Sequence, residues 1–178
     1  NHFCSSLVDR IVPGRPDEAA VRAFEAQAGY TDELMIVAEP YRLWAIEGNE
    51  EVASVLSFSG ADKGVVIVPD IGLYRELKLR LLNGTHTFAC GMAFLRGLPI
   101  VRDAMKDDEM RAYINSLMRQ EIAPAIESDR ITAADADAFS RQVIDRFRNP
   151  YIEHQWLSIA MQYSSKMKMR NLPSLLAY

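Results

Sequence analysis

The sequence predicts a mainly helical protein in which a short α/β segment precedes a longer, all-helical one. Short β-branched runs occur in the first third of the chain, whereas from Ile71 onward apolar residues follow helical spacing. Pro69 lies where the pattern changes. We therefore expect one unit over residues 1–69 and a second over residues 70–178.

The α/β segment is expected to hold strands around one helix. Residues 6–12 alternate apolar and polar side chains, and Pro13-Gly14 then predicts a turn. The next helix opens with a proline and two acids at residues 16–18 and ends at Gly29. Three further apolar runs predict strands at residues 34–38, 43–46 and 65–68.

Four helices are predicted after the boundary, over residues 73–96, 101–126, about 132–149 and 151–164. Gly97 and Pro99 end the first of them, and Pro124 bends or ends the second. Thr132 and Asp135 have near capping-box spacing at the start of the third helix. That helix stops before a proline, because the preceding residue avoids the α region.

Composition excludes several classes of protein. Hydrophobic residues make up 49% and charged residues 25%, as in an ordinary globular domain rather than a disordered chain. The net charge of −4 gives no basic face for nucleic acid, and the apolar runs are too short to span a membrane. Two cysteines, Cys4 and Cys90, are too few for a disulfide framework or a tetrahedral metal site. They indicate packed, reduced thiols in a reducing compartment such as the cytoplasm.

The two ends lack the features of natural termini. The chain opens on Asn1 without an initiator methionine, a basic region or an apolar signal core. It closes at Tyr178 within an apolar pattern, whereas natural ends are more often polar and frayed. We therefore expect a piece of a longer protein.

Polar residues inside the first long helix are the candidates for chemistry, since the sequence holds no Gly-x-Gly-x-x-Gly, Walker or zinc-protease motif. At about 100° per residue, Asn83 lies about 140° and His86 about 80° from Lys78, so all three fit one side of the helix. A lysine desolvated there can act as a base, and an asparagine can donate to a developing alkoxide. From spacing alone we favour a solvated lysine with two capping or core polar residues, because such triplets arise by chance.

Five ordered motifs resemble the mannitol dehydrogenase family, the polyol-specific long-chain dehydrogenases, over nearly the whole chain. They lie at residues 3–13, 39–47, 78–86, 146–150 and 164–166. The central motif is Lys78-x4-Asn83-x2-His86. Within the family, three segments are most similar to the tagaturonate reductase (altronate oxidoreductase) branch: residues 8–14, 82–87 and 170–175.

The resemblance implies a helical substrate domain preceded by the tail of a Rossmann-like dinucleotide-binding domain. It also implies reversible oxidation of a secondary alcohol, with hydride transfer to NAD or NADP and no metal. We expect NAD as the cofactor and interconversion of D-altronate and D-tagaturonate as the reaction. The family's Gly-rich loop would precede residue 1, so cofactor-binding residues stay unknown and the isolated chain is expected to be inactive or very weak.

Residue roles follow from the same resemblance. Lys78 would be the general base, Asn83 would stabilise the alkoxide-like oxygen, and His86 would orient Lys78 or the substrate. Asp9 and Lys166 match family positions that line the substrate pocket and contact substrate. No metal-binding residue is implied.

The substrate end has its own signal. Family polyol dehydrogenases carry an arginine where this chain has Ser158, which implies a different substrate end. A hexonate carries a carboxylate that a polyol lacks, and Lys166, Lys168 or Arg170 could bind it. For Lys168 and Arg170, a solvated basic helix end that balances the helix dipole is an equally good interpretation.

Two alternatives stay open. Within the family, the enzyme could be a fructuronate reductase or a mannitol dehydrogenase. Outside it, the chain could be a non-catalytic helical interaction module whose apolar faces bind a partner. We expect a small sugar-acid substrate as the partner, no nucleic acid and no membrane, and the sequence does not fix the oligomeric state.

Overall fold

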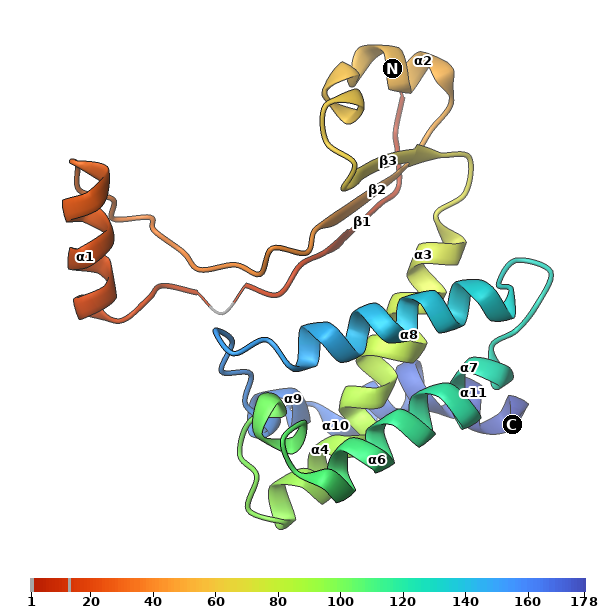
Figure 1. The fold of residues 1–178 in the computed structure, drawn as a ribbon. Helices are drawn as coiled ribbons and strands as arrows, with labels where there is room; N and C mark the ends of the chain where they lie inside the picture. Colours follow the sequence, from red (N-terminus) through yellow and green to blue (C-terminus); the bar gives the residue numbers. More distant parts are fainter. Residues whose placement is uncertain (1, 13) are drawn as a thin grey trace.

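The computed structural model describes residues 2–12 and 14–178, which form three regions (Figure 1). A small sheet stands above a bundle of helices, and an arm carrying one helix extends sideways from the sheet. The predicted turn at Pro13 lies outside the described residues. The predicted fold class, mainly helical with an α/β segment first, is confirmed.

The sheet has three strands in the order β1-β2-β3: β1 (Ser6–Asp9), β2 (Leu43–Glu47) and β3 (Val65–Val68). β1 pairs antiparallel with β2, and β2 pairs parallel with β3. The strands predicted at residues 43–46 and 65–68 are therefore confirmed. β1 is shorter than predicted, because its partner strand begins at Leu43, opposite Asp9.

The strand predicted at residues 34–38 is wrong. This segment returns along the arm and pairs only through an isolated bridge between Val37 and Gly14. Leu34 and Ile36 are exposed. A β-branched run forms a stable strand when one of its faces is buried, and no sheet face covers this run among the described residues.

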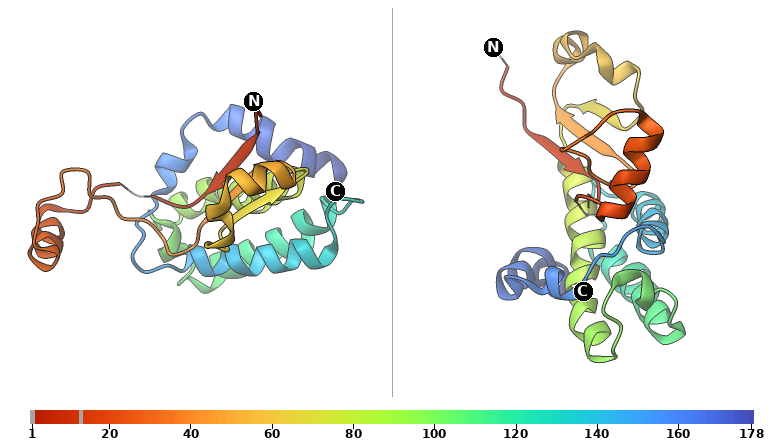
Figure 2. Two further views of the ribbon diagram at one scale, coloured as in Figure 1. Left: turned by 90° about the horizontal axis from the view of Figure 1, so that it is seen from above. Right: turned by 90° about the vertical axis from the view of Figure 1, so that its left-hand side faces the viewer.

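Helix α1 (Glu18–Ala28) begins and ends as predicted. Asp17 caps it by accepting a hydrogen bond from the Ala20 backbone N–H at 2.8 Å. Gly29 adopts φ +78°, the left-handed conformation that ends many helices. Figure 1 and the left view of Figure 2 show α1 at the tip of the arm, away from the helical bundle, and Val21 is its one buried residue.

Between β2 and β3 the chain forms α2 (Glu50–Val55) and the 3-10 helix η1 (Ser57–Gly60). The sequence pattern does not predict them. Asn49 caps α2 by accepting a hydrogen bond from the Val52 backbone N–H at 3.2 Å. With Val52 as the one buried residue of α2, there is too little apolar periodicity to indicate a helix.

The centre of the bundle is one continuous helical run made of α3 (Gly72–Leu77), the π-helical segment η2 (Lys78–Gly84) and α4 (Thr85–Leu95). It confirms the helix predicted over residues 73–96. Gly97 follows with φ +77° and reverses the chain, as predicted. The sequence does not predict the π geometry in the middle of the run.

The helix predicted over residues 101–126 is divided. It consists of α5 (Val101–Ala104), α6 (Asp108–Ser116), the π-helical segment η3 (Leu117–Ile122) and α7 (Ala123–Ala125). The break comes from Asp107, which adopts an extended conformation and caps α6 by accepting from the Met110 N–H at 2.8 Å. As predicted, the run ends just after Pro124.

Helix α8 (Ala133–Phe147) starts at the predicted capping box, with Thr132 and Asp135 bonded reciprocally. The helix predicted over residues 151–164 is wrong. The chain forms the short α9 (Trp156–Ala160) there, and Gln162 then breaks the run with φ 57°. Three more segments complete the chain: α10 (Tyr163–Lys166), the π-helical η4 (Met167–Asn171) and α11 (Leu172–Ala177).

The core lies around the central run. Helices α6 and α8 pack on one side of it and the C-terminal helices on the other (Figure 2). The largest fully buried apolar side chains come from all of these elements: Leu81, Met110, Ile114, Met118, Val143 and Trp156. The predicted boundary near Pro69 falls between β3 and α3, and that it separates two domains stays a prediction.

Two further observations concern the surface and the thiols. None of the described helices is both long enough and apolar enough to cross a membrane. Cys90 packs in the core, but Cys4 is exposed, so the prediction that both thiols are packed is wrong for Cys4. Cys4 precedes β1 at an end of the chain that few described residues cover.

Candidate active site

The π-helical segment η2 begins at Lys78 and contains Asn83. In a π-helix each N–H bonds to the carbonyl five residues earlier, so residues five apart stack along the helix. This geometry brings Asn83 nearer to the side that carries Lys78 than the α-helical angle of about 140° predicts. π segments within α-helices frequently mark functional sites.

Lys78 lies at the junction of the sheet and the helical bundle. Its Nζ donates a hydrogen bond to the Val8 carbonyl oxygen at 2.6 Å and lies 3.7 Å from Asp9 Oδ1. The Lys78 side chain keeps 23% of its surface exposed, whereas that of Asp9 keeps 3%. A partly exposed amine therefore sits beside a buried carboxylate.

Asp9 also forms a buried ion pair with Arg146 of α8. The Arg146 guanidinium donates two hydrogen bonds to the Asp9 carboxylate, from Nη1 to Oδ2 at 2.8 Å and from Nη2 to Oδ1 at 3.0 Å. The same guanidinium bonds Glu39, with Nη2 to Oε1 at 2.8 Å and Nε to Oε2 at 3.2 Å. We call Asp9, Glu39, Arg146 and Tyr41 the Arg146 cluster, since the guanidinium also lies 4.1 Å from the centre of the Tyr41 ring.

The Arg146 cluster is held in place from several elements. Glu39 Oε1 accepts a hydrogen bond from the Ile11 backbone N–H at 2.6 Å. Burial alone would lower the pKa of Arg146, but its hydrogen bonds to Asp9 and Glu39 raise that pKa above its usual value. Burial, with the nearby Asp9 carboxylate, also raises the pKa of Tyr41. At neutral pH the cluster therefore contains a charged guanidinium and a neutral phenol.

His86 lies in an aromatic cluster. Its ring stacks on Phe147 with centroids 4.3 Å apart, and it meets the rings of His154 and Trp156 edge-on at 5.0 and 5.9 Å. Burial, and then the neighbouring His154, lowers the pKa of His86 well below 6.5, so the imidazole is neutral at pH 7. His86 Nε2 is buried and has no hydrogen-bond partner in the described structure.

Lys166 lies near the other end of the central run. Its Nζ donates to the Ile159 carbonyl oxygen at 2.7 Å, and burial together with Arg170 lowers its pKa. Arg170 reaches the Thr87 hydroxyl at 3.2 Å, so it also faces the central run. Lys168 is exposed.

The structure therefore brings some predicted site residues together and leaves others apart. Lys78 and Asp9 are neighbours, and Asn83 follows Lys78 along the π segment. Within the described residues, no hydrogen bond or ion pair joins His86 or Lys166 to Lys78. Four of the five residues, Asp9 excepted, come from the central run or α10.

Arg146 and Glu39 lie within the motifs at residues 146–150 and 39–47, but the sequence predicts neither as a site residue. For Arg146 the sequence does contain a pattern that indicates burial. Arg146 follows Phe139 and Val143 at the i, i+4, i+7 spacing of one helix face, so a charged residue occupies an apolar face. Buried arginines are almost always paired with carboxylates. Glu39 lies in an irregular segment, where no periodicity reveals burial.

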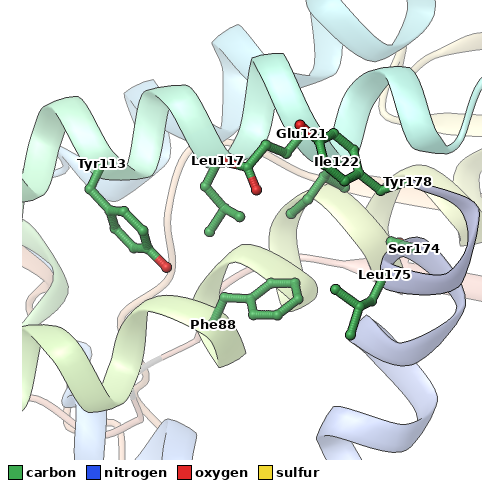
Figure 3. Close-up of a pocket in the computed structure, with 8 residues that line it drawn as sticks. All are labelled: Phe88, Tyr113, Leu117, Glu121, Ile122, Ser174, Leu175 and Tyr178. Atoms are coloured by element: carbon green, nitrogen blue, oxygen red, sulfur yellow. The ribbon is translucent and has the colours of Figure 1, made fainter.

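One pocket borders helix α4 of the central run (Figure 3). It has a volume of about 220 Å³ and lies between α4, α6, η3 and α11. Of the described residues that line it, none belongs to the predicted site: Phe88, Tyr113, Leu117, Glu121, Ile122, Ser174, Leu175 and Tyr178. Nor do the described residues gather three or more side chains of the kinds that bind metals.

Two family models match this chain. The one described as "Mannitol dehydrogenase C-terminal domain" covers residues 70–178, and the one described as "Mannitol dehydrogenase Rossmann domain" covers residues 1–60. Together they span most of the sequence.

Curated proteins and solved structures give the same result. The chain is 42% identical over its whole length to "Altronate oxidoreductase" of Bacillus subtilis (strain 168), and 44% identical over 99% of its length to the protein of that name from Klebsiella pneumoniae (strain 342). It spans 36% of the length of each relative. A D-sorbitol dehydrogenase crystal structure matches with a TM-score of 0.77 at 26% identity, over 97% of this chain and 34% of that one. Pseudomonas fluorescens mannitol 2-dehydrogenase, in a ternary complex with NAD and D-mannitol, matches with a TM-score of 0.72 and the same identity and coverage.

Proposed function

The chain belongs to the mannitol dehydrogenase family, and from that premise we propose that it is a segment of an NAD-dependent oxidoreductase that interconverts D-altronate and D-tagaturonate. The observation that carries the proposal is the Lys78 amine beside the buried Asp9 carboxylate, 3.7 Å away. Identity of 42–44% to relatives named for altronate supports the choice of substrate. Since those relatives are about three times longer, the activity belongs to a larger protein.

The residues of this chain serve the substrate side of the reaction. The sequence holds no Gly-x-Gly-x-x-Gly loop of the kind that holds a pyrophosphate, and the cofactor-binding residues stay unknown. When bound, the nicotinamide accepts the hydride from the alcohol carbon. We propose residues 1–69 as the tail of the dinucleotide-binding domain and residues 70–178 as the substrate domain.

Lys78 is the general base of the proposed reaction. As altronate is oxidised, the O–H bond of the reacting hydroxyl breaks and its proton passes to Lys78 Nζ. The electrons of that bond form the carbonyl π bond, while the C–H electron pair leaves with the hydride. In the reverse direction Lys78 returns the proton to the ketone oxygen of tagaturonate. The Val8 carbonyl and the Asp9 carboxylate hold the amine at the site.

Other predicted residues complete the site. The Asn83 amide donates to the oxygen as negative charge develops on it. His86, neutral and with Nε2 unpartnered in the described structure, contacts a substrate hydroxyl through that nitrogen. Lys166 retains N–H donors beyond the one given to Ile159, and these bind the hexonate carboxylate.

A cytoplasmic location belongs to the same proposal. Both cysteines are free, including the exposed Cys4, as is usual where thiols are kept reduced.

The test is an assay of the full-length protein that contains this segment, with NAD and three substrates in parallel: D-altronate, D-mannonate and D-mannitol. The proposal expects the highest kcat/KM with altronate. A preference for mannonate or mannitol would move the assignment to fructuronate reductase or mannitol dehydrogenase. No oxidation of any of the three would favour a non-catalytic interaction module.

A further inference from the structure

The Arg146 cluster reaches Lys78 through one residue. Asp9 bonds Arg146 on one side and lies 3.7 Å from Lys78 Nζ on the other. Glu39 pairs with Arg146, but no hydrogen bond or ion pair joins it to Lys78 among the described residues. The network therefore has an inner member beside Lys78 and two outer members behind it.

We propose that Arg146 and Glu39 are positioning residues that set, through Asp9, the charge around Lys78, and thereby fix the pH range in which Lys78 can accept a proton. This inference rests on the proposed function of Lys78 as a base. It goes beyond that function by giving a task to two residues that lie behind the amine.

Burial makes these charges effective. The side chains of Asp9, Glu39 and Arg146 are 3%, 1% and 5% exposed, so water screens them poorly. The two carboxylates favour a protonated Lys78, and the guanidinium opposes it. Arg146 divides its hydrogen bonds between Asp9 and Glu39. The guanidinium charge is therefore shared between the two carboxylates. Removing the charge of one carboxylate changes how much of the other carboxylate's charge the guanidinium neutralises.

Besides Arg146, one further cation touches this region: Arg10 Nε donates to the Glu39 carbonyl oxygen at 2.9 Å. Tyr41 stays a neutral phenol because its pKa is raised, mainly by burial. Tyr74, on α3 about one turn before Lys78, faces Tyr41 and is also a phenol. From β1, Lys78 also donates a hydrogen bond to the uncharged Val8 carbonyl. On η2 itself, Arg80 is paired with Glu76 at 3.0 Å.

Farther along the central run, titratable groups surround His86. Those that act on it are His154, Arg146, Arg170 and Lys166, so the Arg146 guanidinium acts on His86 as well as on Asp9. Burial holds His86 and His154 in their neutral forms near neutral pH. Among the described residues, the ionic contact of Lys78 is Asp9, and behind Asp9 lie Arg146 and Glu39, with Arg10 beside Glu39.

Glu39→Gln is the sharpest test. The amide keeps an oxygen that can accept from the Ile11 N–H and from Arg146, but it carries no charge. With one carboxylate removed, the guanidinium opposes protonation of Lys78 more strongly. We expect the pH of half-maximal kcat for altronate oxidation to fall by about half a unit, less than for an adjacent charge because Glu39 acts from behind Asp9.

Arg146→Lys is the second variant, and it should move the profile the opposite way. A lysine at position 146 cannot donate two parallel hydrogen bonds to Asp9, so more of the Asp9 charge acts on Lys78. The pH of half-maximal kcat should therefore rise. Glu153→Gln is the matched control. Glu153 pairs with Arg102 at an exposed site, 69% exposed, where the loss of charge is screened and the midpoint should stay.

The experiment measures kcat for altronate oxidation against pH in the full-length wild type and the three variants, each first checked for folding by circular dichroism. Opposite shifts in Glu39→Gln and Arg146→Lys, with none in Glu153→Gln, support the inference. Folded variants that lose activity but keep the wild-type midpoint would overturn it, since a purely structural clamp predicts that result. If only one of the two folds, its shift alone decides. A wild type that oxidises mannonate or mannitol instead contradicts only the proposed substrate, and the pH comparison then uses that compound.

Discussion

The Nζ of Lys78 lies 3.7 Å from Oδ1 of Asp9, at the junction where the first strand of the sheet meets the central helical run. The two residues are far apart in the sequence, and Arg146 of a third element holds the same carboxylate from its other side. A base, its neighbouring carboxylate and a buried counter-ion therefore meet where the α/β segment contacts the helical one.

Asn83→Ala should reduce the turnover of the full-length enzyme by about 10²–10³, the usual effect of losing one donor to a developing oxyanion. The effect should appear in kcat, because the amide acts on charge that develops during the reaction. Steady-state kinetics with altronate checks it. A rise in KM with kcat preserved would make Asn83 a residue that only binds substrate.

Lys166→Met should lower kcat/KM for altronate about tenfold or more, because a charge-assisted bond to the carboxylate is lost. Any residual activity with uncharged mannitol should fall less. The ratio of the two efficiencies before and after the substitution is the measurement. Lys168→Met, at an exposed position two residues farther along the chain, is the control and should leave the ratio unchanged.

If Lys166→Met lowers kcat/KM for altronate and for mannitol equally, Lys166 does not bind the carboxylate. Arg170 would then take that role, since it also faces the central run through Thr87.

Acid should destabilise the protein through its buried histidines. Burial lowers the pKa of His86 well below 6.5 and also lowers that of His154, so the unfolded chain binds protons at a higher pH than the folded one. The contribution of these two histidines to the free energy of unfolding should therefore be constant above about pH 6.5. It should decrease as the pH falls below that value. Urea unfolding at a series of pH values measures the slope. His86→Phe, which retains a ring against Phe147, should make it shallower, and an equal slope would contradict the burial of a neutral imidazole.

Arg146→Leu should destabilise the fold by about 3–5 kcal/mol, because Glu39 would remain buried without its counter-ion and Asp9 would keep only the Lys78 amine, 3.7 Å away. Arg141→Leu is the control on the same helix. Its pair with Asp137 is exposed, so its loss should cost about 0–1 kcal/mol. Urea midpoints with comparable slopes give both values, and equal losses would show that the Arg146 cluster contributes no special stability.

Local sequence signals predict the elements that carry their own start and stop residues. Asp17 and Gly29 bound α1, and Thr132 with Asp135 starts α8, as the capping rules require. The sequence fails where tertiary contacts decide. Residues 34–38 have strand propensity but no sheet partner, and Gln162 interrupts the last predicted helix with a left-handed conformation that glutamine rarely adopts.

The candidate site divides in the same way. Lys78, Asn83 and His86 are found by their motif, yet the π geometry that changes the angle between the first two is absent from any α-helical projection. Arg146 occupies an apolar face of α8, and this position predicts that it is buried. No sequence pattern predicts that Glu39 is its second carboxylate partner. Such pairs form between elements that only the folded chain brings together.

The central claim is that Lys78 removes the hydroxyl proton, and single-turnover kinetics of Lys78→Ala in the full-length enzyme tests it most directly. We expect the rate of hydride transfer from altronate to fall by about 10²–10⁴, the usual contribution of a positioned base, while the affinity for NAD stays near the wild-type value. Lys63→Ala, at an exposed position outside the site, should transfer hydride at the wild-type rate. A near-normal rate in folded Lys78→Ala would contradict the claim.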